Sequence, residues 1–191
     1  MLLETVAVLL ALSYVVLAIR EHRSCWIAAA LSAALYVWIF AQARLYMEAA
    51  LQVFYIGMAL YGWRQWRSDD GHLGLRIQRW PWTRHVLLII ATASGASLCG
   101  FLLARHTDAA MPYLDSGTTI AALITTWLVA RKVLENWLYW IVIDAASVYL
   151  YGNRTLDLTA LLYAGYVVLA VAGYWQWRRL YAQQSSPKPI S

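Results

Sequence analysis

An aspartate, Asp144, lies near the middle of the long apolar stretch 135–151 of this 191-residue sequence. Trp137, Trp140 and Asp144 are spaced i, i+3 and i+7, so one face of a helix would carry two indoles and a carboxylate. A carboxylate at membrane depth costs about 2.5–3.5 kcal/mol, so it should face protein, water or a ligand rather than lipid. Since no Lys or Arg lies within 135–151, we expect Asp144 to belong to a polar substrate site. The alternative is a protonated or hydrogen-bonded carboxyl between helices.

The two indoles differ in what they suggest. Trp140 lies one turn deeper than Trp137, and its ring is suited to stacking on a flat heterocycle or holding a cation. Trp137 is equally consistent with an interfacial aromatic belt. Two residues of the predicted helix 46–66, Gln52 and Tyr55, share a face, and an amide at membrane depth needs partners. The alternative to substrate contact is interhelical hydrogen bonding for Gln52 and symmetric helix packing for Tyr55.

Four further residues are candidates for the same substrate site. Asn136 precedes Trp137 and either caps the helix or contacts substrate. Asp115 lies one turn into a predicted helix and is either a rim contact or a charge that favours the helix N-terminus. Tyr36 and Tyr151 would line a cavity, with packing or belt positions as the alternative.

Known catalytic motifs are absent from the sequence. It has no phosphate-binding G-x-x-x-x-G-K-[ST], no G-x-S-x-G and no H-E-x-x-H. The two cysteines have no metal-ligand spacing, and the four histidines fall at predicted helix ends or in loops. We therefore expect neither an enzyme nor a cofactor or metal.

The composition explains which elements must position these residues. The chain is 62% hydrophobic and 13% charged, against about 25% charged in soluble domains. We predict an all-α integral membrane protein with the lipid bilayer as its surroundings. Seven spans are expected at about 3–19, 26–42, 46–66, 85–104, 111–130, 136–152 and 156–174.

The basic residues predict the orientation of these spans. With seven spans, one side of the membrane receives twelve: Arg20, Arg23, Arg64, Arg67, Arg76, Arg79, Arg84, Arg131, Lys132, Arg178, Arg179 and Lys188. The other side receives three: Arg44, Arg105 and Arg154. This asymmetry predicts an outside N-terminus and a cytoplasmic C-terminus. The net charge of +5 is then a topology signal, and no nucleic-acid partner is expected.

An internal repeat orders the spans. Residues 26–67 align with 137–178 without a gap at an offset of 111, and both segments contain G-x-x-Q-W-R. The second and third spans thus repeat as the sixth and seventh. The first span is expected to repeat as the fifth, and the fourth span is a connector. Because four spans separate each element from its copy, the repeat is parallel. We predict one domain, 1–181, in a 3+1+3 arrangement with halves at about 1–67 and 111–178, a connector at 85–104 and a polar tail at 182–191.

Several motifs resemble those of the PnuC family of bacterial vitamin transporters: E-N-W-L-x-W-I-V-I-D, L-Q-V-F-Y, Y-G-W-R-Q-W, R-K-V-L-E-N-W and the pair Asp115-Ser116. The resemblance covers about residues 20–180. It implies facilitated diffusion of nicotinamide riboside across the inner membrane, a cytoplasmic kinase that traps the product for pyridine nucleotide biosynthesis, and assembly as a homotrimer in some members.

One residue departs from the family pattern. The family motif is commonly W-x-x-x-N, whereas this chain has Trp140-x-x-x-Asp144. An aspartate suits a cation with hydroxyl groups, which describes nicotinamide riboside and also thiamine, the substrate of the PnuT relatives. Riboflavin is uncharged and fits less well. Nicotinamide riboside is the first expected substrate and thiamine the second, carried by rocking of the two halves. A non-transporting membrane scaffold is the alternative of a different class.

Overall fold

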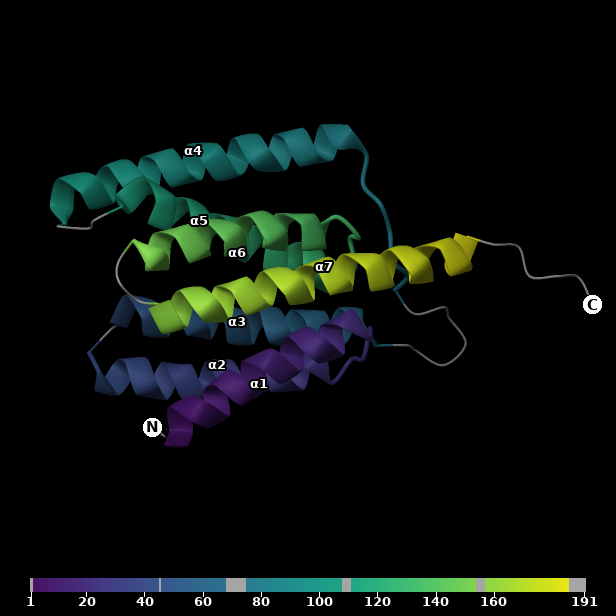
Figure 1. Cartoon of the computed structure of the whole chain (residues 1–191), viewed down its shortest axis with the longest axis horizontal. Coiled ribbons are helices and arrows are strands. Elements are labelled where there is room, and N and C mark those ends of the chain that lie inside the picture. Colours follow the sequence, from purple (N-terminus) through teal and green to yellow (C-terminus); the bar gives the residue numbers. More distant parts are fainter. Residues whose placement is uncertain (1, 45, 68–74, 108–110, 154–156, 186–191) are drawn as a thin grey trace, which may run out of the picture. The chain divides into compact units, whose positions relative to one another are not determined.

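A computed structural model describes residues 2–44, 46–67, 75–107, 111–153 and 157–185. These residues form seven helices (Figure 1): α1 Leu2–Ile19, α2 Cys25–Gln42, α3 Tyr46–Gln65, α4 Trp82–His106, α5 Pro112–Ala130, α6 Asn136–Gly152 and α7 Asp157–Ser185. The seven-helix, all-α prediction is confirmed. By length and apolar composition alone, α1, α2 and α4 qualify as membrane spans among the described residues.

Two helices are longer than the apolar runs that predicted them. The fourth begins at Trp82, directly after Pro81, instead of at 85, and it ends at His106. The missing N–H of Pro81 is no loss at a helix start. The seventh continues from 174 to Ser185, because Q-W-R-R-L-Y-A-Q-Q consists largely of good helix formers although it is polar. The predicted tail at 182–191 therefore begins inside α7, and 186–191 lie outside the described residues.

The chain divides into two compact units, 1–76 with 183–191, and 77–182. In the first unit α2 packs against both α1 and α3. A buried hydrogen bond joins two of these helices, with Ser32 Oγ donating to the carbonyl of Ala7 at 2.8 Å. Near the start of α2, Arg23 Nε donates to the carbonyl of Trp63 at 3.0 Å, and its guanidinium lies 3.5 Å from the centre of the Trp63 ring.

In the second unit α5 packs against α4 and α6 (Figure 1). Small residues bring α4 and α5 together, and α4 contains a run of them at 91–97. A Cβ on Gly100 would lie 2.9 Å from the backbone of Tyr113, and one on Gly95 would lie 3.2 Å from Ile120. Glycine is therefore needed at Gly100 for this close approach.

The internal repeat is visible in helix bounds and in the turns. Shifted by 111 residues, the bounds of α1 and α2 fall within one residue of those of α5 and α6, and α3 and α7 begin at equivalent positions. Both α1 and α5 end in the same motif, in which Glu21 and Lys132 have φ of 54° and 50°. The flanking hydrogen bonds also correspond: His22 N–H to Leu17 O at 2.9 Å, and Val133 N–H to Leu128 O at 3.0 Å. These are Schellman bonds, here with a non-glycine residue in the left-handed position.

Candidate functional site

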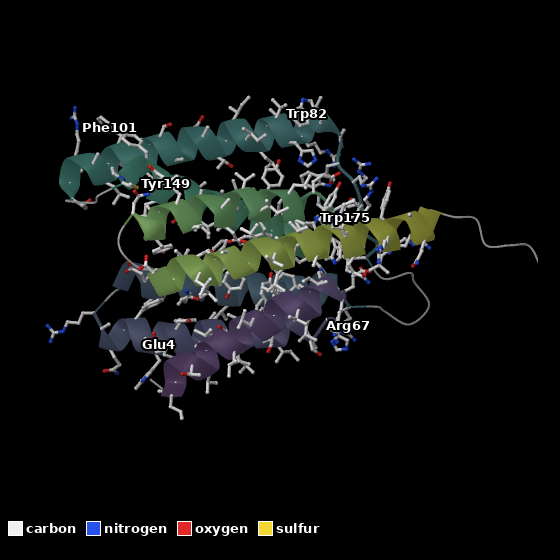
Figure 2. All side chains as sticks on the ribbon, viewed as in Figure 1. Glu4, Arg67, Trp82, Phe101, Tyr149 and Trp175 are labelled. Atoms are coloured by element: carbon white, nitrogen blue, oxygen red, sulfur yellow. The ribbon has the colours of Figure 1, made fainter. Side chains whose placement is uncertain are left out.

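Asp144 lies on the buried face of α6. Its side chain is 5% exposed, and Trp137, Ile143, Ser147 and Leu150 of the same helix are also buried. On the opposite face, Val142 is 68% exposed. Tyr149, which is labelled in Figure 2, is 61% exposed. The helical spacing of the sequence thus assigned the inward face correctly, and the carboxylate is sheltered from the surroundings as expected.

Tyrosines of α6 and α7 gather near this carboxylate. The rings of Tyr151 and Tyr163 stack with centroids 5.2 Å apart and an interplanar angle of 12°, and their hydroxyls share a hydrogen bond. Tyr166 meets Tyr163 edge to face at 5.9 Å. The Asp144 carboxyl interacts electrostatically with the Tyr163 hydroxyl. A carboxylate with phenol groups beside it offers acceptors for hydroxyl protons and a negative centre for a cation.

The two tryptophans of α6 have different surroundings. Trp137 is 3% exposed and packs against α7, where a Cβ on Gly173 would lie 2.6 Å from its ring. Its indole also contacts Trp177 edge to face, with centroids 5.5 Å apart. Trp140 is only half-buried. Of the two indoles, Trp140 is the less buried.

Asn136 and Asp115 occupy the starts of their helices. Asn136 is fully buried, and its amide nitrogen donates to the carbonyl of Val133 at 2.6 Å. It therefore braces the turn before α6 by donating, whereas a capping side chain would accept from the helix. Asp115 is half-buried in the first turn of α5, and Glu4 stands at the equivalent position of α1.

The other candidates, Tyr36, Gln52 and Tyr55, belong to the first unit. All three are half-buried. Tyr36 stacks on Phe40 at 5.5 Å and interacts electrostatically with Glu4. Tyr55 contacts the ring of Phe54, with centroids 5.9 Å apart. Their contact with substrate stays a prediction.

The repeat relation shows that Asp144 and Trp140 of α6 are not duplicated, whereas Trp137 is equivalent to Trp26. At the offset of 111, Asp144 corresponds to Ala33 and Trp140 to Ala29 of α2. Gln52 corresponds to Tyr163. The helices are thus similar in outline, while the carboxylate and the second indole belong to one copy.

Sequence reasoning missed several buried polar residues. Ser147, Ser116, Thr125 and His85 are all at most 6% exposed. Ser147 satisfies its hydroxyl within α6 by donating to Ile143 O at 2.9 Å. Ser147 follows Asp144 by three residues, so the helical period would have found it. No local pattern points to His85, whose hydrogen-bond partner Tyr139 lies 54 residues away.

The family model described as nicotinamide mononucleotide transporter matches residues 1–179. The chain belongs to this family. The curated nicotinamide riboside transporter PnuC of Escherichia coli is 24% identical over 204 residues, which cover 92% of this chain and 84% of that protein. The riboflavin/roseoflavin transporter RibM of Streptomyces davaonensis is 24% identical over 136 residues, covering 68% of this chain and 63% of that protein.

A solved structure has the same fold. The crystal structure of the vitamin B3 transporter PnuC aligns with a TM-score of 0.75 and 23% identity, covering 96% of this chain and 83% of that one. The family and these relatives are transporters rather than enzymes. With its apolar helices, the chain is a multi-pass transporter of the bacterial inner membrane.

Proposed function

We propose that this chain carries nicotinamide riboside across the inner membrane by facilitated diffusion. Its family match covers nearly the whole chain, and relatives from Escherichia coli and Neisseria mucosa are named nicotinamide riboside transporters. The structural observation that carries the proposal is the buried Asp144 on the same face of α6 as Trp140. A lone buried carboxylate within a membrane helix is a functional site by default.

The chemistry of the vitamin matches these side chains. Nicotinamide riboside carries one positive charge on its pyridinium ring and hydroxyls on its ribose. Asp144 would neutralise the charge or accept hydroxyl protons, and Trp140 would stack on the ring. Tyr151 and Tyr163 would supply further hydrogen-bonding groups. Gln52 of α3 is proposed to contact the substrate through its amide, with Tyr36, Tyr55 and Asp115 as additional contacts.

The packed residues of α6 have a different proposed role. Trp137 and Asn136 are fixed by contacts to α7 and to the preceding turn. We assign them to holding α6 in place for Trp140 and Asp144. A binding experiment separates the two roles, because a packing residue affects stability before affinity.

Thiamine is the second candidate substrate. Its thiazolium ring is also a cation, and it carries a hydroxyl, so Asp144 favours it equally. The relative RibM is named for riboflavin, which is uncharged and larger. The aspartate gives no advantage to riboflavin, and for this reason we rank it third.

The transport cycle is proposed to use the repeat. A 3+1+3 plan with parallel halves and an outside N-terminus is supported by the twelve-to-three division of basic residues and by the equivalent turns after α1 and α5. Rocking of such halves gives alternating access. A homotrimer and a cytoplasmic kinase that traps the vitamin complete the proposal and rest on the family resemblance.

Uptake by reconstituted liposomes tests the function. The wild-type protein should equilibrate labelled nicotinamide riboside until inside and outside concentrations match, without chemical conversion. Asp144→Ala should weaken binding by about 10- to 100-fold, because a charged hydrogen bond contributes about 1.5–3 kcal/mol. Asp157→Ala is the matched control, since Asp157 is an exposed aspartate at the start of α7. Absence of transport of any vitamin by wild-type protein would leave a scaffold as the better description.

A further inference from the structure

Glu135, the residue before α6, joins three parts of the second unit. Its Oε1 accepts from Arg79 Nε at 3.0 Å, and its Oε2 lies 3.4 Å from the backbone N of Trp80 and 3.9 Å from His85 Nε2. The hydrogen bond to Glu135, and then its negative charge, raise the pKa of Arg79 above the ordinary arginine value. One carboxylate thus connects the segment before α4, α4 itself and the start of α6.

A second contact ties α4 to the first turn of α6. His85 Nδ1 and the Tyr139 hydroxyl are hydrogen-bonded at 2.9 Å, and their rings lie 5.9 Å apart. His85 is 6% exposed, and its Nε2 lies 3.9 Å from Glu135 Oε2 without forming a hydrogen bond. Both nitrogens of this buried imidazole therefore lie near residues at the start of α6.

The turn before α6 is held from the other side as well. Gln78 N–H donates to Lys132 O at 3.0 Å, Leu134 N–H donates to Gln78 O at 2.9 Å, and Gln78 Nε2 donates to Arg131 O at 2.8 Å. Trp80 packs edge to face on Trp127 of α5 at 5.5 Å. The segment 77–81 thereby fixes the backbone from which α6 begins.

These hydrogen bonds act on α6, the helix that carries the proposed site. Tyr139 is next to Trp140 in sequence, and Asp144 follows little more than one turn later. The equivalent positions of α2 are Ala29 and Ala33, and the turn before α2 is held differently, by Arg23 on Trp63. The helix that carries the proposed site is thus tied by side-chain hydrogen bonds to α4 and to the segment before it. Sites on rigid, supported elements keep their geometry within about 0.5 Å, and a looser helix loses affinity.

We propose that His85, Glu135 and Tyr139 form a latch that positions α6, so that Trp140 and Asp144 meet the vitamin in one fixed arrangement. His85 and Tyr139 are positioning residues, which act through Trp140 and Asp144 and not by touching substrate. The inference rests on the proposed function, because it describes how the site of that function is held.

Binding by purified variants tests the latch. Kd is measured by calorimetry against nicotinamide riboside and thiamine, and the thermal midpoint is recorded for each protein. Tyr139→Phe removes one hydroxyl, and His85→Leu removes the imidazole; each should weaken binding about 5-fold or more, as coupled pairs typically do. The double variant should have the same Kd as whichever single variant binds the vitamin less tightly, because both changes break the same contact. His85→Gln should keep near-wild-type affinity, since its amide can hydrogen-bond to Tyr139.

Matched controls separate positioning from general damage. Tyr149→Phe changes an exposed tyrosine of the same helix, and His106→Leu changes an exposed histidine of α4. Both should bind as wild type. Tyr139→Phe should lower the thermal midpoint by no more than the loss of one hydrogen bond does, while Kd, measured well below that midpoint, rises. Wild-type Kd in Tyr139→Phe and His85→Leu, or effects that simply add in the double variant, would overturn the latch. A wild-type protein that binds neither vitamin would instead overturn the proposed function. Binding by the wild-type protein is therefore measured before that of the variants.

Discussion

Trp137 lies directly against Gly173, so that a Cβ at this glycine would be 2.6 Å from the six-membered ring of the indole. The first half repeats the arrangement with Trp26 against Gly62. A second tryptophan completes each cluster edge to face: Trp177 at 5.5 Å and 87°, and Trp66 at 5.5 Å and 86°. Two segments 111 residues apart thus use the same packing where the second and third helices of each half meet.

The close contact predicts that Gly173→Ala and Gly62→Ala destabilise the protein. A methyl group cannot enter without displacing a large buried ring, and overpacking of this kind costs about 1–3 kcal/mol. The thermal midpoint of the purified protein in detergent should fall for both variants by similar amounts.

Glycines with open surroundings provide the controls. Nothing lies within 4 Å of a Cβ built on Gly165 of α7 or Gly57 of α3. Alanine there should be neutral or stabilising by about 0.5–1 kcal/mol, since glycine inside a helix carries an entropic cost. Equal midpoints for Gly173→Ala and Gly165→Ala would contradict the packing described for Trp137.

The tryptophan clusters show how far the sequence could be interpreted. The gapless offset of 111 predicted that Trp26 and Trp137 are equivalent, and the equivalent contacts of the two indoles agree with it. It did not predict that Trp137 packs on glycine, because a tryptophan near a helix end also fits an interfacial belt. The inward face of Asp144 was predictable because helical periodicity is local.

Features that depend on distant residues escaped prediction. His85 and Tyr139 are separated by 54 positions, and no periodicity connects two helices with a loop and a further helix between them. The end of α7 was missed for another reason. Hydropathy follows the apolar run, which ends near 174, while helix formation follows backbone propensity and continues to Ser185.

Packing between α4 and α5 predicts a second difference between glycines. Gly100→Ala should lower the thermal midpoint, because its Cβ would lie 2.9 Å from the Tyr113 backbone, which cannot rotate away as a side chain can. Gly117→Ala is the control on the facing helix, since its Cβ would be 3.9 Å from Ala96, an ordinary contact. A Gly117→Ala variant as unstable as Gly100→Ala would show that glycine serves flexibility here and not close approach.

The bond between α1 and α2 predicts the effect of losing one buried hydroxyl. Ser32→Ala removes the donor to Ala7 O and should cost about 0.5–1.5 kcal/mol of stability. Ser13→Ala is a matched change, because Ser13 Oγ donates at the same distance of 2.8 Å to Leu9 O within its own exposed helix turn. The unfolding midpoint should fall for Ser32→Ala and stay near wild type for Ser13→Ala. The reverse order would argue that Ser32 does not join the helices.

The last prediction separates the two indoles of α6. Trp140→Phe should weaken binding of a cationic vitamin about 2- to 10-fold, because phenylalanine attracts a cation less strongly than tryptophan, and it should leave the thermal midpoint unchanged. Trp137→Phe should do the opposite, since the lost atoms come from the contact with Gly173 and Trp177. Trp38→Phe, at a 60% exposed position of α2, controls for the substitution itself. Equal losses of affinity in Trp137→Phe and Trp140→Phe, with stability intact in both, would assign substrate contact to both rings and remove the distinction drawn from their burial.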